Sequence, residues 1–217
     1  WNVAFGYETL KANTTVSGNT AIGHIALRNN TSNYHTAVGY SALAANTTGN
    51  NNTATGAWAL SQNTTGGNNV SFGVQTLFLN TTGANNSGFG SFALNQNTTG
   101  GSNSALGDGA LYSNTTGASN VAVGKSALYN NTTGIDNVAS GSASLNLNTT
   151  GNYNAAYGTS TLRSNTTGGL NTAVGHQTLY ANTTGTGNVA SGYYALGHNT
   201  TGTYNTAMGY HAYINLT

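Results

Sequence analysis

A repeat of 17 residues fills this chain of 217 residues and restricts its fold more than any other feature. The pattern is Asn-x-Ala-x-Gly-x-x-Ala-Leu-x-x-Asn-Thr-Thr-Gly-x-x. Its thirteen copies start at Asn2, Asn19, His35, Asn52, Asn69, Asn86, Asn103, Asn120, Asn137, Asn154, Asn171, Asn188 and Asn205. Eleven of the twelve intervals are 17 residues long, and the interval from Asn19 is one residue shorter, within residues 31–34. A fixed period of this length predicts stacked, similar units.

Two glycine-containing corners divide each copy. The glycine at position 5 is present in all thirteen copies, and a second glycine follows Asn-Thr-Thr in ten. Glycine permits backbone conformations that other residues avoid, so both places are expected to be turns. The apolar runs between them, such as 121–123 and 127–129, have the length of short strands, whereas a helix needs at least ten uninterrupted residues.

The sequence therefore predicts an all-β fold, a parallel β-solenoid (β-roll) of about 13 coils of 17 residues with two short strands per coil. Residues 1–217 form one repeat domain. Because the first and last copies are almost ordinary, we expect the chain to be an excerpt of a longer array or one subunit of a filament, stacked head to tail.

In such a stack, equivalent side chains form columns. The leucine at position 9 is the best candidate for the core, and the alanine at position 3 faces it; Tyr213 takes the leucine's place in the last copy. The leading asparagines are expected to form an amide ladder. The larger residues at position 4, such as Phe72 and Phe89, alternate with the alanines. If alanine faces inward, position 4 forms an exposed apolar stripe that needs a partner; the opposite orientation remains open at this point.

Composition restricts the functions open to such a rod. Only 3% of the residues are charged and the formal net charge is +1, with four scattered basic residues, which disfavours nucleic acid as a partner. Cysteine is absent, and no apolar run is long enough to cross a membrane. The three carboxylates and five histidines suggest no catalytic or metal-binding group, and we expect the histidines to lie on the solvated surface. We expect no enzymatic activity and no cofactor.

The Asn-Thr-Ala-Val-Gly of residues 171–175, with its variants at 19–23 and 205–209, resembles the repeats in the heads of trimeric autotransporter adhesins and related bacterial and phage fibre proteins. The resemblance covers essentially the whole chain. It implies a left-handed parallel β-roll, usually three chains side by side, at the cell surface and used for adhesion. The 17-residue coil and its Asn-Thr-Thr-Gly turn depart from that pattern.

Each of the first twelve copies carries an acceptor sequence for asparagine-linked glycan at position 12, Asn-Thr-Thr or Asn-Thr-Ser. The candidate sites are Asn13, Asn30, Asn46, Asn63, Asn80, Asn97, Asn114, Asn131, Asn148, Asn165, Asn182 and Asn199, and Asn215 starts one further acceptor sequence. Regular acceptors on an exposed turn predict a dense glycan coat, which would keep a nearly uncharged rod hydrated. Two alternatives remain open: the motif is only favourable turn chemistry, or the sugar is linked to the threonine hydroxyls.

The sequence thus favours a structural subunit of a glycosylated extracellular fibre at the cell surface, associating with itself as a head-to-tail filament or a homotrimer. The first alternative is an adhesin or receptor-binding fibre head, in which aromatic residues after the corner glycine contact sugar or protein ligands; examples are Tyr7, Tyr40, Trp58, Tyr193 and Tyr210. A lower alternative is an ice-binding solenoid, in which paired threonine columns order water.

Overall fold

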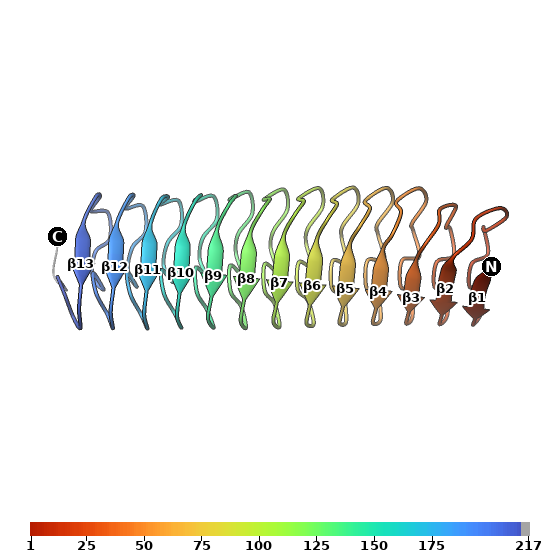
Figure 1. The fold of residues 1–217 in the computed structure, drawn as a ribbon, viewed down its shortest axis with the longest axis horizontal. Helices are drawn as coiled ribbons and strands as arrows, with labels where there is room; N and C mark the ends of the chain where they lie inside the picture. The colour runs from red at the N-terminus through yellow and green to blue at the C-terminus, as the bar shows by residue number, and fades with distance from the viewer. Residues whose placement is uncertain (214–217) are drawn as a thin grey trace.

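The computed structural model describes residues 1–213 and confirms the all-β parallel solenoid (Figure 1). One sheet contains thirteen strands in sequence order, and each neighbouring pair is parallel. The strands are β1 (Asn2–Phe5), β2 (Asn19–Ile22), β3 (Thr36–Val38), β4 (Thr53–Thr55), β5 (Val70–Phe72), β6 (Ser87–Phe89), β7 (Ser104–Leu106), β8 (Val121–Val123), β9 (Val138–Ser140), β10 (Ala155–Tyr157), β11 (Thr172–Val174), β12 (Val189–Ser191) and β13 (Thr206–Met208).

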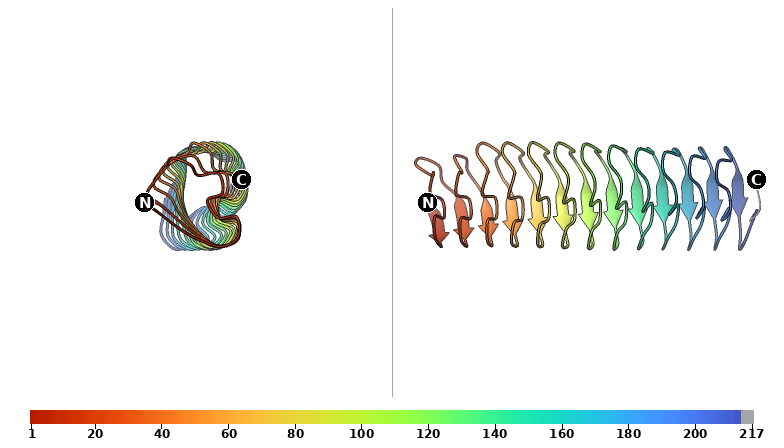
Figure 2. Two further views of the ribbon diagram at one scale, coloured as in Figure 1. Left: turned by 90° about the vertical axis from the view of Figure 1, so that its right-hand side faces the viewer. Right: turned by 180° about the vertical axis from the view of Figure 1, so that it is seen from behind.

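The strands pair in the register of the repeat, so that Ala105 lies opposite Ala122 and Leu106 opposite Val123. With a strand spacing of about 4.8 Å, the twelve steps from β1 to β13 give a rod roughly 58 Å long. The two ends of the described chain lie at opposite ends of this rod, and the coils superimpose around a narrow interior in the end-on view (Figures 1 and 2).

Each coil contains one regular strand among the described residues, and the expectation of two strands per coil is wrong. The second apolar run bends instead, because positions 7 and 9 have positive φ values, such as 57° at Trp58 and 50° at Leu60. Its backbone groups still bond between coils: the Leu60 N–H donates to the carbonyl oxygen of Thr76 at 3.0 Å. This run therefore follows the rod with ladder-like hydrogen bonds but without extended geometry.

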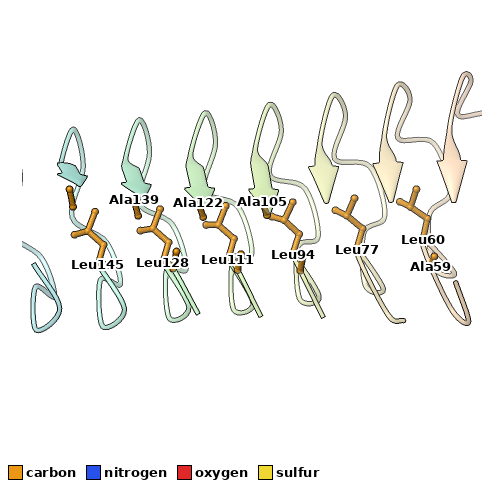
Figure 3. Close-up of a cluster of buried hydrophobic side chains, with 14 of the residues drawn as sticks. Ala59, Leu60, Leu77, Leu94, Ala105, Leu111, Ala122, Leu128, Ala139 and Leu145 are labelled. Carbon is orange, nitrogen blue, oxygen red and sulfur yellow. The ribbon is translucent and has the colours of Figure 1, made fainter. Parts of the chain in front are cut away.

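The leucine at position 9 and the alanine at position 3 fill the interior, as the repeat predicts (Figure 3). Every leucine of this column from Leu27 to Leu196 is fully buried, and the alanines face them from the strands. Tyr213, in the corresponding place of the last copy, is exposed. Because alternate residues of a strand point to opposite sides, positions 2 and 4 face outward. The orientation left open by the sequence is thus decided: alanine is inside, and the apolar stripe is outside.

The corner glycine at position 5 is required by geometry. Gly124 has a φ of +125°, and a Cβ atom built on it would lie 2.7 Å from the carbonyl carbon of Gly141, the corner glycine of the next coil. Side chains are therefore excluded both by the backbone conformation and by the close stacking of successive corners. In the part of the chain that the structure describes, no helix is long and apolar enough to cross a membrane.

Candidate functional site

The Asn-Thr-Thr-Gly turn is the candidate site, and its asparagines lie inside the coil. Eleven of the twelve, from Asn30 to Asn199, are at most 1% exposed, while Asn13 in the first coil is half-buried. Asn97 is representative: its Nδ2 donates to Oδ1 of Asn80 in the preceding coil at 2.7 Å and to the carbonyl oxygen of Gly100 at 2.9 Å. Its Oδ1 accepts from Nδ2 of Asn114 at 2.7 Å. We call this column the position-12 ladder.

The expected exposure of these asparagines is therefore wrong for eleven of the twelve. The Nδ2 atom that would carry a sugar is already committed to two hydrogen bonds in a space without solvent, so asparagine-linked glycan is incompatible with this conformation. The turn-chemistry alternative describes what the asparagine does: its side chain closes the turn on the glycine carbonyl three residues later. The acceptor sequence at Asn215 lies outside the described residues.

The leading asparagines form a second ladder, as the sequence predicts. In the regular coils, the backbone N–H of one leading asparagine donates to Oδ1 of the one before, as Asn69 does to Asn52 at 2.9 Å. The Asn69 Nδ2 group donates to the carbonyl oxygen of Gly83 at 2.9 Å. The two ladders thus meet at the same glycine carbonyl, because Nδ2 of Asn80 also donates to Gly83. Polar side chains in the interior are satisfied by stacking, which links every coil to the next.

His35 takes the place of a leading asparagine and is 1% exposed, so the expectation of a solvated surface position is wrong for this histidine. Its Nδ1 accepts the backbone N–H of Asn52 at 3.1 Å, as an asparagine Oδ1 does in other coils. Its Nε2 lies 2.8 Å from Oγ of Ser32, which donates to the carbonyl oxygen of Gly49 at 2.7 Å. Burial lowers the pKa of His35 to about 4. The neutral imidazole, with its proton on Nε2, fits this set of partners.

The two threonines of the turn have different surroundings. We call the threonine at position 13 the inner threonine and that at position 14 the outer threonine. The hydroxyl of an inner threonine donates to the carbonyl oxygen of the inner threonine in the next coil, as Thr98 does to Thr115 at 3.0 Å. The outer threonines are exposed in every coil that has one, and their hydroxyls bond to no other described residue; Thr99 is an example. In each of the eleven coils that have an outer threonine, its exposed hydroxyl thus remains free on this edge.

The outward face of the sheet carries the second surface feature. Positions 2 and 4 face outward, and the apolar residues among them form an apolar stripe, defined here by its clearly exposed members: Val3, Phe5, Ile22, Phe72, Phe89, Leu106, Val121, Val123, Tyr157, Val174, Val189 and Met208. The remaining residues at these positions are mostly threonine and serine. Phe72 and Phe89 stack with their ring centroids 5.3 Å apart. Its members lie on one face of the sheet and come from ten of the thirteen strands. No member comes from β3, β4 or β9, where polar residues such as Thr53, Thr55 and Ser140 interrupt the stripe.

Aromatic side chains also gather beside the corner glycines at both ends of the rod. Tyr7, His24, Tyr40 and Trp58 form one column, with successive ring centroids 5.3, 5.1 and 5.3 Å apart. A second cluster contains His176, Tyr193, Tyr194, His198, Tyr210 and His211. The sequence suggested several of these residues as a ligand-contacting surface, and the structure brings them together in two groups rather than one.

Three of the seven charged residues form a small cluster near the first corner, where Glu8 contacts Lys11 and lies 3.7 Å from Arg28. The hydrogen bond from Lys11 lowers the pKa of the Glu8 carboxyl. Asp108 follows a corner glycine and Asp136 precedes a strand, so the two lie at opposite ends of the strands. Among residues 1–213, no group of three or more histidine, aspartate or glutamate side chains is placed to hold a metal ion.

Comparison with models of protein families, with characterised proteins and with solved structures found no match to this chain. The turn, the stripe and the aromatic clusters are therefore the features of this chain that bear on its function.

Proposed function

We propose that this chain is a structural subunit of an extracellular surface fibre. The observation that carries this proposal is what the recurring residues of the repeat do: the corner glycine, the core leucine, both asparagines and the inner threonine all make contacts between successive coils. A chain whose repeated residues are devoted to stacking is suited to holding length and shape. The low charge and the likeness of its motifs to surface-fibre repeats support a place outside the cell.

The apolar stripe supports self-association of these rods. The sheet face that carries it runs for roughly 58 Å and is about 10 Å wide along a three-residue strand, which gives roughly 600 Å². Stable interfaces bury about 800 Å² per partner, so the stripe with its flanking residues has the size of one contact surface. A second copy is the natural occupant, because two such stripes have the same length and the same absence of charge. A side-by-side dimer or homotrimer follows, and head-to-tail stacking would extend it.

Electron microscopy and sedimentation of the purified chain test this proposal. The chain is expected to form filaments or side-by-side oligomers. The double substitution Phe72→Thr and Phe89→Thr, which installs the residue already present at Thr55, is expected to weaken the lateral contact. Val74→Thr is the matched control, since Val74 is equally exposed but lies outside the stripe. Monomeric rods at all concentrations, or equal effects of control and stripe variants, would contradict the proposal.

The aromatic column of Tyr7, His24, Tyr40 and Trp58 favours an adhesin or receptor-binding fibre head as the second candidate. Exposed aromatic rings bury large areas on binding and are common in recognition surfaces. A ligand contacting this column should quench the Trp58 fluorescence, which can be followed during titration with candidate glycans.

The ice-binding alternative has less support, because the inner threonine hydroxyls are engaged by the backbone and only one of the two threonine columns is free to order water.

A further inference from the structure

The constant positions of the coil have visible structural reasons, with one exception. A side chain at Gly100 would meet the carbonyl oxygen of Gly117 and the Asn97 side chain, so this position needs glycine. Asn97 belongs to the position-12 ladder, and Thr98 bonds the next coil through its hydroxyl. The outer threonine, Thr99, is equally constant, yet its side chain is exposed and its hydroxyl bonds to no described residue.

The constancy of the outer threonine is informative because other surface positions differ between the copies of the repeat. Another surface position has changed from coil to coil: position 6, which is partly or fully exposed, is Ala57, Val74, Ser91, Asp108 and Lys125 in five successive copies. The outer position has kept threonine in eleven coils, at Thr15, Thr48, Thr65, Thr82, Thr99, Thr116, Thr133, Thr150, Thr167, Thr184 and Thr201. Common descent of the copies therefore does not explain an unchanged outer threonine. A requirement for a free hydroxyl at this place does.

The geometry also decides which atom of the Asn-Thr-Thr turn can carry a covalent group. Nδ2 of Asn97 is buried and makes two hydrogen bonds. Oγ1 of Thr98 is engaged by the carbonyl oxygen of Thr115. Oγ1 of Thr99 faces solvent without a protein partner. Only the outer threonine can be substituted without breaking a contact between coils.

We propose that the outer threonines carry hydroxyl-linked sugars, which deepens the proposed role as a surface fibre and rests on it. In the transfer, the threonine Oγ1 attacks the anomeric carbon of a sugar held as a glycosyl phosphate ester. The new bond is C1–Oγ1, the bond from C1 to the phosphate oxygen breaks, and the phosphate leaves with the electron pair. The hydroxyl proton passes to a base of the transferase. No oxidant or reductant is involved.

A neutral group fits this column better than a charged one. Neighbouring outer threonines are one coil apart, roughly 4.8 Å, so phosphoryl groups would place like charges side by side along the rod. An uncharged sugar avoids that repulsion and supplies hydration to a chain in which 3% of residues are charged. The sugars would lie along the turn edge, away from the sheet face that carries the apolar stripe, which leaves that stripe free for a second copy.

The short second coil provides an internal negative control. It reads Asn30-Thr31-Ser32, and the hydroxyl of Thr31 donates to the carbonyl oxygen of Thr47. Ser32 is buried, with its hydroxyl bonded to Gly49 and in contact with His35. This coil has no outer threonine. Although its sequence is a valid acceptor for asparagine-linked glycan, it should be bare.

The test is mass spectrometry of the native protein, with fragmentation that keeps sugars on their residues. We expect sugars on the outer threonines, and alkaline β-elimination should release them. Asn30, Thr31 and Ser32 should carry no sugar. A bare polypeptide mass, or sugar on the asparagines, on the inner threonines or equally on the second coil, would overturn the proposal. Filaments without sugar would overturn the sugar proposal and leave the proposed fibre function intact. Glycosylated monomers would support the sugar proposal and contradict the fibre function.

Variants produced in the native host sharpen the test. Thr99→Val should lower the mass by one glycan beyond the change in side chain, whereas Thr99→Ser keeps the hydroxyl and should keep the glycan. Thr98→Val is the matched control: it removes the hydrogen bond to Thr115 and should leave the glycan mass unchanged. Equal glycan loss from Thr98→Val and Thr99→Val would refute the assignment to the outer threonine.

Discussion

Replacing His35 by asparagine is expected to remove most of a loss of stability that the rod suffers in acid. In the wild type, Nδ1 of His35 accepts the backbone N–H of Asn52 in a buried site, and protonation of Nδ1 would set two donors against each other. An asparagine at this position would present Oδ1 to the same N–H, as Asn52 does to Asn69. The variant thus keeps the ladder and removes the titrating group.

The magnitude follows from the two pKa values. The pKa of His35 is lowered from 6.5 to about 4, so above pH 6.5 the imidazole is neutral in both the folded and the unfolded chain. As the pH falls below 6.5, His35 becomes protonated in the unfolded chain but stays neutral in the folded rod. The free energy of unfolding therefore decreases until the pH reaches the pKa of the folded state. Each pH unit corresponds to about 1.4 kcal/mol, so the loss at pH 4 approaches about 3 kcal/mol.

Urea denaturation of the wild type and of His35→Asn at pH 7.5 and pH 4 measures this effect. The difference in unfolding free energy between the two proteins should grow by about 3 kcal/mol in favour of the variant as the pH falls. Glu8, whose pKa is also shifted, is present in both proteins and cancels in the comparison. The protection of the Asn52 amide from exchange, relative to the intrinsic rate at each pH, should fall in acid only in the wild type. Parallel pH profiles for the two proteins would refute the reasoning.

Three further substitutions test the stacking. Gly124→Ala should destabilise the rod by about 3 kcal/mol or more, because a positive φ and a clash with Gly141 act together. The control is Gly67→Ala, at a position where other coils hold alanine, and it should cost less than about 1 kcal/mol. Thermal melts of the two variants measure the difference. Leu111→Ala should cost about 2–5 kcal/mol by leaving a cavity in the buried column, and a change below 1 kcal/mol in urea would contradict the core assignment. Asn97→Ala should cost about 2–4 kcal/mol, since it leaves Oδ1 of Asn80 without a donor and removes one of the two partners of Asn114 Nδ2 and of the Gly100 carbonyl. Unchanged amide exchange in the two flanking coils would argue against the ladder.

The sequence predicted the coil, its core and one of its two polar ladders because these depend on periodicity. Leucine and alanine at fixed positions indicate which residues meet, and a glycine in every copy indicates a corner. The second strand was predicted wrongly because the apolar run at 127–129 has a strand-like composition. The structure places Leu128 at a φ of +50°, where its N–H donates to the carbonyl oxygen of Ser144 in the next coil and its side chain is buried in the core.

The location of the sequon asparagines was missed for a related reason. An acceptor sequence describes what a transferase reads and does not specify which way the side chain points. The spacing Asn-x-x-Gly was the available signal, since the asparagine Nδ2 closes on the glycine carbonyl three residues later, as Asn63 does on Gly66 at 2.9 Å. The burial of His35 could have been inferred from its register, because it occupies an asparagine position in the repeat.

The two chain ends lie at opposite ends of the rod, and this arrangement determines how the protein would respond to tension (Figure 1). A pull on the two ends acts along the axis, so every junction between coils carries the same force, and the coils are released one after another from an end or from the weakest junction. Each released coil adds 17 residues of extended chain, about 55 Å after subtracting the step it occupied in the rod. Under tension the rod should therefore unfold coil by coil. It lengthens in equal steps and absorbs mechanical work at each step before the chain is fully extended.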